Sequence, residues 1–464
     1  RLKNEARFLR AYYHYLLFEL YGPIPIMTEI SDPAASDLDY YRNSVDEVVQ
    51  FIDSELNECY NSLPEKEVND DGSANENRSA APTKGAALAI LAKLHVYAAS
   101  PLLNGGYAEA VALKDSQDKQ LFPAKDDGKW QIALNALQRF IDYAKTHYHL
   151  YKEKDKDGEL NAEESLYQLF QVSLNNPEAI WQTSKNSWGD VGGEGRERRC
   201  TPRAIYSGFG CVGVLQEAID DFYMNDGKSI HESGLYSEEG IGEDGIPNMY
   251  KNREPRFYQA ITYSGKTWQK TTKQIYFYKG SGDDNSKADM SYSGYLLYKG
   301  MNRDLLNQGS NAKSKYRAGM LFRLADFYLL YAEALNHVNP SDERIIAHID
   351  SVRYRAGIPL LKDIKPEIKG NQTLQEEAIR KERRIELFAE GQRYFDVRRW
   401  MCADEEGYKQ GGPVHGMNMN ADNLEDFMER TAFETRIFER RMYLYPIPLN
   451  EIQKSSKLVQ NPGW

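Results

Sequence analysis

The sequence lacks a long apolar run and an excess of positive charge. Its longest uninterrupted apolar stretch is residues 85–92, between Lys84 and Lys93. A transmembrane helix needs about twenty such residues, so no helix that crosses a bilayer is predicted. There are 58 Lys and Arg against 69 Asp and Glu, a net charge of −11. Nucleic-acid binding depends on a basic surface, so nucleic acid is not an expected partner.

Motifs for catalysis and metal binding are also scarce. The four cysteines form no Cys-x-x-Cys pair and no zinc spacing. Cys200 and Cys211 are close enough in sequence to bridge, but no disulfide is predicted. Glycine-rich phosphate loops, the Gly-x-Ser-x-Gly elbow and His-Glu-x-x-His do not occur. Adjacent acids such as Asp220-Asp221 do not establish the spatial carboxylate pair of a glycosidase, so we predict that the protein is not an enzyme.

Helical periodicity, in contrast, is strong. The sequence is 41% hydrophobic and 27% charged, which is ordinary for a folded globular chain. Apolar residues three or four positions apart form one stripe along several stretches. Thr373 followed by Glu376 predicts a capping box at the start of one helix. The predicted helices span residues 4–21, 44–63, 83–99, 130–148, 319–338, 341–356, 373–390 and 392–402.

These helices follow one another as neighbouring pairs, and small residues lie beside aromatics on their stripes. Such pairing is typical of tetratricopeptide-like repeats, although the strict repeat motif is absent. The predicted fold is mainly α, a single domain over residues 1–464. Within it we expect N-terminal helical pairs at 1–149, a variable loop-rich region at 150–318, and C-terminal helical pairs with a closing segment at 319–464.

The middle region, residues 150–318, is rich in Gly, Asn, Asp, Ser and Tyr. Short strands are predicted at 179–183 and 274–278, and one short helix at 215–223. A long irregular stretch in a compact fold is usually either functional or disordered, and its aromatic content argues against disorder. We therefore expect ordered ligand-binding loops on a rigid helical scaffold.

Charged residues are densest between Arg380 and Arg399, where Glu382, Glu386 and Glu390 repeat every four positions. Such a ladder of carboxylates repels itself. We predict that the interleaved arginines 383, 384 and 393 neutralise it as a structural lattice of salt bridges, rather than as an anion site. The isolated basic cluster at 196–203 is predicted to be a solvated loop.

Aromatic loop residues are the candidate ligand contacts. The sequence has 32 tyrosines, and an aromatic ring can stack on the C–H face of a sugar while its polar atoms stay solvated. We predict ligand binding by Trp188, Trp268, Tyr292 and Tyr295, with Asp190 as an acceptor for sugar hydroxyls. Asp283-Asp284 could bind calcium, but two adjacent acids are weak evidence, so no cofactor is predicted.

Several motifs, taken together, resemble those of the SusD/RagB family. They occur in family order along the whole chain. The motifs are residues 4–13 (NEARFLRAYY), 20–25 (LYGPIP), 252–257 (NREPRF), 323–334 (RLADFYLLYAEA), 352–357 (VRYRAG), 382–387 (ERRIEL), 390–400 (EGQRYFDVRRW), 445–448 (YPIP) and 460–463 (QNPG).

This resemblance implies a SusD-like fold and a surface-exposed lipoprotein of the outer membrane that takes part in polysaccharide utilisation. Family members capture glycans without catalysis and act as a lid on a SusC-like TonB-dependent transporter. In the family, a segment that carries the lipidated cysteine and often some ligand contacts precedes the motif that begins here at Asn4. We therefore expect the lipid anchor and some binding residues to lie outside this chain.

Two other functions are compatible with the same fold. Oligopeptide capture, as in RagB-like proteins, would need backbone-pairing edges and a less aromatic cleft. A helical-repeat interaction protein without a small ligand would not need the long aromatic middle region. The expected function is glycan capture, and the sequence does not indicate which glycan is bound.

Overall fold

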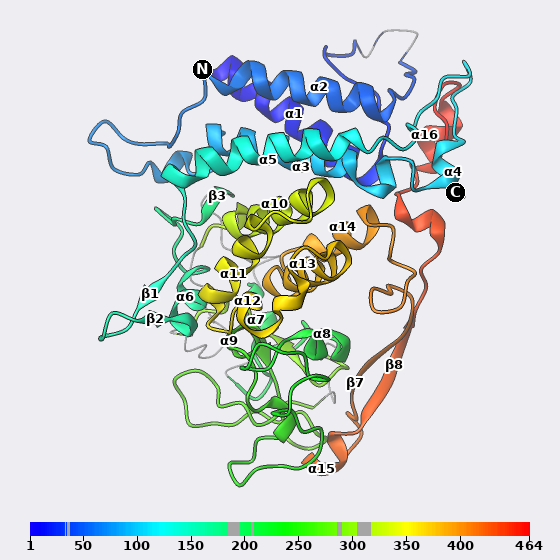
Figure 1. Ribbon diagram of the computed structural model, residues 1–464. Coiled ribbons are helices and arrows are strands. Elements are labelled where there is room, and N and C mark those ends of the chain that lie inside the picture. The colour runs from blue at the N-terminus through cyan, green and yellow to red at the C-terminus, as the bar shows by residue number, and fades with distance from the viewer. Residues whose placement is uncertain (33, 35–37, 184–194, 206–207, 285–289, 304–316) are drawn as a thin grey trace.

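The computed structural model describes residues 1–464 except 33, 35–37, 184–194, 206–207, 285–289 and 304–316. Long helices gather at the N-terminal end of the molecule, further helices form its middle, and loop-rich segments form the opposite end (Figure 1). The main helices are α1 (Leu2–Tyr21), α2 (Val45–Tyr60), α3 (Lys84–Ala99), α5 (Gly128–His147), α10 (Leu324–Val338), α11 (Arg344–Ala356), α13 (Gln372–Glu386) and α14 (Gln392–Arg399).

Short helices and antiparallel two-stranded sheets complete the described structure. The short helices are α4 (Ala108–Val111), α6 (Ala162–Gln168), α7 (Arg196–Cys200), α8 (Gln216–Asp221), α9 (Pro255–Ala260), α12 (Leu361–Ile364), α15 (Leu424–Phe427) and α16 (Leu449–Lys454). The paired strands are β1 (Glu153–Lys154) with β2 (Leu160–Asn161), β3 (Ala179–Gln182) with β6 (Met320–Arg323), β4 (Ile261–Thr262) with β5 (Leu296–Leu297), and β7 (Gly412–Met417) with β8 (Arg430–Arg436).

Three of the four predicted helical pairs are confirmed, whereas α13 packs mainly on α10 and not on its predicted partner α14. Helix α1 packs on α2, α3 on α5, and α10 on α11. Side chains satisfy the free amides at two helix starts: Ser44 and Glu47 form a capping box at α2, and the Thr83 hydroxyl accepts a hydrogen bond from the backbone N–H of Ala86 at α3. Helix α3 is buried on nearly every side because α2 and α5 both cover it.

Two predicted helix boundaries were wrong. The helix predicted over 319–338 begins only at Leu324, because Met320–Arg323 pairs with β3 instead. The capping box predicted at Thr373 does not form. Asn371 caps α13, and its side-chain oxygen accepts from the backbone N–H of Leu374 at 3.2 Å. The same helix ends at Glu386, four residues before the predicted end.

Predictions for the middle region were partly right. The strand predicted at 179–183 is β3, and the helix predicted at 215–223 is α8. Residues 274–278 form no strand beyond one isolated bridge at Gln274. The cluster at 196–203 is not a solvated loop, since it contains α7, in which Glu197 and Cys200 are buried. The β7–β8 hairpin, drawn in orange in Figure 1, was not predicted.

Two hydrophobic cores support these elements. The first lies among the long helices and includes Trp181 from β3. The second lies in the loop-rich half and includes Ile385 from α13, Met417 from β7 and Phe427 from α15. Each core therefore combines residues from more than one of the three regions that the sequence suggested.

Within the described residues, no single helix is long and apolar enough to cross a membrane. Only a pair of helical segments bent by 70°, Lys84–Ala99 with Pro101–Val111, meets the requirement for length and composition. All four cysteines are free thiols, so Cys200 and Cys211 do not bridge in this structure.

Candidate functional site

A cleft of about 410 Å³ opens where three segments meet: the loop between α2 and α3, the C-terminal end of α5, and the segment 173–182 that contains β3. In Figure 1 these segments lie at the left of the molecule. The volume is within the usual range for small-ligand sites, about 300–1,000 Å³. Side chains that decide its chemistry include Glu65, Lys66, Glu67, Asn75, Ser79 and Gln182.

Trp181 forms part of the wall of the cleft, but its ring is held by the protein itself. It packs edge-on against Phe8 and Tyr12, with ring centroids 5.2 and 4.7 Å apart. Its indole N–H donates to the backbone carbonyl of Ala80 at 3.0 Å, which ties the α2–α3 loop to β3. The side chain is only 6% exposed. Trp181 therefore shapes the cleft and leaves little ring surface for stacking.

The charged side chains that line the cleft all have partners within the protein. Glu65 lies 3.5 Å from the imidazole Nε2 of His147 and 3.6 Å from the ammonium of Lys84. Glu67 pairs with Arg1 and Arg78. These carboxylates are thus compensated without a ligand. The remaining cation, the ammonium of Lys66, donates to the side-chain oxygen of Asn175.

The neutral polar side chains fall into two groups. Asn176 is fully used: its amide donates to the carbonyls of Leu169 and Val172 at 2.8 and 3.0 Å, and its oxygen accepts from the N–H of Glu178. Tyr148 lies deeper, and burial raises its pKa to about 12, so its hydroxyl keeps its proton at neutral pH.

In the second group are Asn75, Ser79 and Gln182. All three line the cleft and are partly exposed. Their side chains make no hydrogen bond to any described residue. Two amides and a hydroxyl can both donate and accept hydrogen bonds. These groups can therefore bind hydroxyl or amide groups of a ligand without breaking an existing contact.

No sequence motif marks these three residues. Asn75 and Ser79 come from a polar loop, and Gln182 comes from the end of a predicted strand. Trp268, Tyr292 and Tyr295 are not among the described residues that line the cleft. Trp188 and Asp190 lie outside the described residues.

Trp268 and Tyr295 do not lie on exposed loops, which corrects that prediction. Trp268 is 2% exposed and packs edge-on against Tyr298 in the second core. Tyr295 is fully buried, and its hydroxyl donates to Gln216 at 2.6 Å and accepts from the hydroxyl of Tyr250 at 2.8 Å. Their ring faces are covered by neighbouring side chains, and this leaves no surface for a sugar. A polar sequence neighbourhood does not prevent burial.

Tyr292 is the one predicted aromatic contact that the described structure exposes, at 56%. Its neighbours Ser291 and Ser293 are hydrogen-bonded to each other, with their hydroxyls 3.0 Å apart. A role in ligand binding stays a prediction for Tyr292.

Calcium binding at Asp283-Asp284 also stays a prediction. Asp283 accepts a hydrogen bond from the backbone N–H of Ala204 at 2.6 Å, and Asp284 accepts from that of Gly280 at 2.7 Å. Burial raises the pKa of Asp283 to about 6. The described part of the chain contains no group of three or more His, Cys, Asp or Glu side chains that could hold a metal ion.

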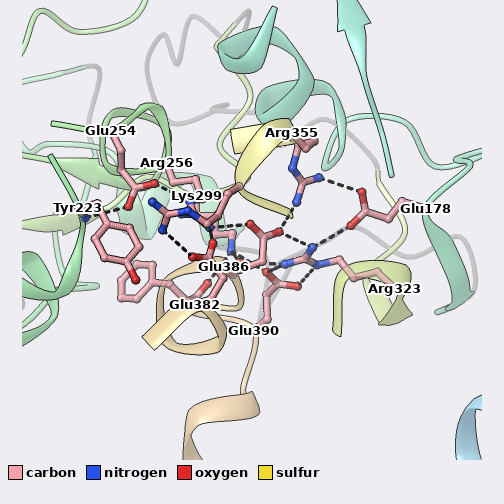
Figure 2. A network of polar contacts seen from close by, with 12 residues as sticks. Glu178, Tyr223, Glu254, Arg256, Lys299, Arg323, Arg355, Glu382, Glu386 and Glu390 are labelled. Atoms are coloured by element: carbon pink, nitrogen blue, oxygen red, sulfur yellow. Dashed lines mark hydrogen bonds and ion pairs between the residues drawn. The ribbon is translucent and has the colours of Figure 1, made fainter. Parts of the chain in front are cut away.

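A second polar cluster, the ionic network, is largely buried (Figure 2). It joins α9, α11 and α13 to the residues at the ends of β3, β5 and β6. Its described members are Glu178, Glu254, Arg256, Lys299, Arg323, Arg353, Arg355, Glu382, Glu386 and Glu390. Its carboxylates and cations alternate in space, so it is a structural lattice, as the sequence predicted.

The partners in this lattice differ from those predicted. Glu386 contacts Arg256, Arg323 and Arg355, which come from three other elements, and not the arginines beside it in sequence. Burial alone would raise the pKa of Glu386, but these guanidinium groups outweigh burial and hold it well below its usual value. Arg383 pairs instead with Asp326 of α10, at 2.8 Å.

The network is closed to ligands of any size. A neighbouring cavity lined by Arg256, Lys299 and Arg323 has a volume of about 20 Å³, which is room for about one water molecule. The Nη2 atom of Arg256 is buried and has no partner among the described residues. The 410 Å³ cleft is therefore the better candidate for a ligand site.

Comparison with known proteins places the chain in one family. The sequence profile of the SusD family matches residues 177–464, and a profile described as "starch-binding associating with outer membrane" matches residues 1–96. The solved structure of BT4246 has 27% sequence identity and a TM-score of 0.82, with 99% of this chain and 83% of that chain covered. A laminarin-binding SusD-like protein has 22% identity and a TM-score of 0.53, with 100% and 79% covered, which shows a shared fold.

SusD-like protein P2 of Formosa agariphila is 28% identical over 160 residues, and the alignment covers 34% of this chain and 28% of that protein. The alignment thus spans less than a third of this curated relative. The SusD family profile, in contrast, matches more than half of the present chain and includes the ionic network and the β3 wall of the cleft. The chain belongs to the SusD family.

Proposed function

We propose that the protein captures glycans at the outer surface of the outer membrane and delivers them to a SusC-like TonB-dependent transporter. The observation that carries this proposal is the cleft, in which Asn75, Ser79 and Gln182 are left without partners. Amide and hydroxyl groups match the hydroxyl groups of a sugar, because both sides donate and accept hydrogen bonds. The cleft volume of about 410 Å³ suits a short stretch of glycan chain.

Family membership supports the same function. The profile that matches the N-terminal residues is described as starch-binding and associated with the outer membrane. A solved protein that shares the fold is described as laminarin-binding. In this proposal the protein is held at the membrane by a lipid anchor and acts as a lid on its transporter.

Capture without catalysis is part of the proposal. Hydrolysis of a glycosidic bond needs two carboxyl groups facing one substrate. In the cleft, Glu65 and Glu67 are instead paired with basic side chains of the protein. Incubation with chromogenic glycosides is therefore expected to release no chromophore above the buffer control.

Affinity electrophoresis tests glycan capture. The purified chain is run through native gels cast with single polysaccharides, and a peptide mixture is titrated in parallel by calorimetry. Retardation by at least one polysaccharide is expected. Binding heat from peptides without retardation would overturn the proposal in favour of oligopeptide capture.

Co-purification tests the proposed partner. The tagged protein is expected to co-purify from detergent-solubilised outer membranes with a SusC-like transporter.

A further inference from the structure

The cleft carries charges of both signs, and each of them already has a contact within the protein. Glu65 faces His147 and Lys84, and Glu67 faces Arg1 and Arg78. The ammonium group of Lys66 donates to Asn175. A sulfate or carboxylate that entered the cleft would meet two carboxylates and, among the described lining residues, one lysine, Lys66, whose ammonium group already donates to Asn175.

The energetic consequence is a penalty for charged ligands. An ionic group that leaves water needs a close counter-charge or several hydrogen bonds to offset its lost hydration. To supply one here, the protein would have to give up an existing contact, such as that of Lys66 with Asn175 or that of Arg78 with Glu67. An uncharged hydroxyl group has no such cost, because Asn75, Ser79 and Gln182 can bind it directly.

We infer that the cleft selects uncharged glycans and rejects glycans that carry uronate or sulfate groups. This inference rests on the proposed function and adds the chemical class of its ligand. The amides of Asn75 and Gln182 and the hydroxyl of Ser79 recognise sugar hydroxyl groups. The charged pairs around them hold the segments of the cleft wall in position and do not contact the ligand.

The test uses the whole purified chain and a panel of neutral and anionic polysaccharides in native gels. The neutral set is dextran, laminarin, galactan and xylan, and the anionic set is polygalacturonate, alginate and a sulfated galactan. Any neutral polysaccharide that retards the protein is then compared with its own chemically sulfated derivative by calorimetry. At least tenfold weaker binding of the sulfated form is expected.

The outcomes distinguish a failure of this inference from a failure of the proposed function. Retardation by neutral polysaccharides alone supports both. Equal or tighter binding of anionic polysaccharides overturns the inference while glycan capture stands. The absence of retardation by every polysaccharide overturns both.

Variants locate the selectivity in the cleft. Gln182→Ala and Asn75→Ala are each expected to weaken binding of the neutral glycan about five- to tenfold, as expected for the loss of a neutral hydrogen bond. Ser79→Lys adds an uncommitted cation and is expected to strengthen binding of the sulfated form about tenfold. Unchanged affinities in all three variants, with unchanged thermal unfolding, would overturn the inference.

Gln131→Ala is the matched control. Gln131 is an exposed amide on α5, sixteen residues before His147. At 1.5 Å of rise per residue it lies about 24 Å along the helix from the cleft. Its removal is expected to leave the affinity for both glycan forms unchanged within twofold.

Discussion

The cleft and the ionic network are both rich in charged and polar side chains, yet only one of them can receive a ligand. In the network, each carboxylate is paired with at least one cation, in most cases from another element, and the adjoining cavity of about 20 Å³ is too small for a glycan. In the cleft the charged groups have contacts as well, but the side chains of Asn75, Ser79 and Gln182 have no hydrogen-bond partner among the described residues. A dense group of polar residues therefore indicates a binding site only where some hydrogen-bonding capacity is unused.

The two regions also differ in what a substitution should change. Removing a member of the network leaves opposite charges buried without compensation, so stability should fall steeply. Removing one of the free side chains of the cleft should leave the fold intact and lower only the affinity for a ligand. Measurements of unfolding and of binding on the same variants can therefore separate the two roles.

The largest effect is expected from Glu386→Ala. This change leaves Arg256, Arg323 and Arg355 buried without their shared carboxylate. The free energy of unfolding, measured with urea, is expected to fall by about 3–5 kcal/mol.

Glu434→Ala serves as the control for that experiment. Glu434 is an exposed carboxylate on β8 that pairs with Arg436 at 2.8 Å, and exposed pairs of this kind contribute less than about 1 kcal/mol. A similar loss of stability in both variants would contradict the assignment of the ionic network as a structural lattice.

A comparable loss of stability is expected from Trp268→Ala, because a buried indole is replaced by a cavity. Truncation of a buried Trp costs about 3–5 kcal/mol, whereas Tyr292→Ala at an exposed position should cost less than about 0.5 kcal/mol. Chemical unfolding of the two variants measures this difference. Comparable losses would contradict the assignment of Trp268 to the core.

Acid should destabilise the helical half through Glu333. The carboxyl of Glu333 accepts hydrogen bonds from Arg399 at 2.6 and 2.8 Å and from the indole of Trp400 at 2.8 Å. Burial would raise its pKa, but Arg399 outweighs burial and lowers the pKa from its ordinary value of 4.5 to about 2. The carboxylate therefore contributes stability above about pH 4.5, and this contribution is lost as the pH falls through about 2.

From this group alone, the free energy of unfolding should fall by about 3 kcal/mol across that range. Urea unfolding at a series of pH values checks the expectation against Glu333→Gln, which cannot titrate. The variant should be less stable than the wild type at pH 6, and the difference should shrink towards pH 2. If the difference in unfolding free energy between the wild type and Glu333→Gln stayed constant with pH, Glu333 would not be the group whose protonation destabilises the protein in acid.

Much of the helical half could be predicted because its determinants are local. Ser44 and Glu47 cap α2 from three residues apart, and the apolar stripes have the period of a helix. The start of α10 could not be predicted in the same way. Residues 320–323 continue the apolar pattern, and only their pairing with β3, far away in sequence, makes them a strand.

The site was harder to predict because it depends on contacts between distant segments. Trp268 stands among polar residues in the sequence and Tyr295 follows a Ser- and Gly-containing stretch, and only the second core reveals that their rings are covered. Asn75 and Gln182 carry no motif. They become candidates only because the α2–α3 loop and β3 border the same cleft and because neither side chain has a partner.

The smallest effect is expected from Lys66→Ala, and it sharpens the distinction between paired and unpaired groups within the cleft itself. Lys66 is an exposed cation that lines the cleft, and simple electrostatics would make it a ligand contact. Its ammonium group, however, already donates to Asn175.

If only unpaired groups bind the glycan, Lys66→Ala should change the affinity less than about twofold, whereas Gln182→Ala weakens it about five- to tenfold. Calorimetry of both variants with the same neutral glycan shows whether Lys66 contacts the ligand or only the unpaired groups do. A loss at Lys66 equal to that at Gln182 would mean that the ammonium group exchanges Asn175 for the ligand, and that paired charges in this cleft also take part in binding.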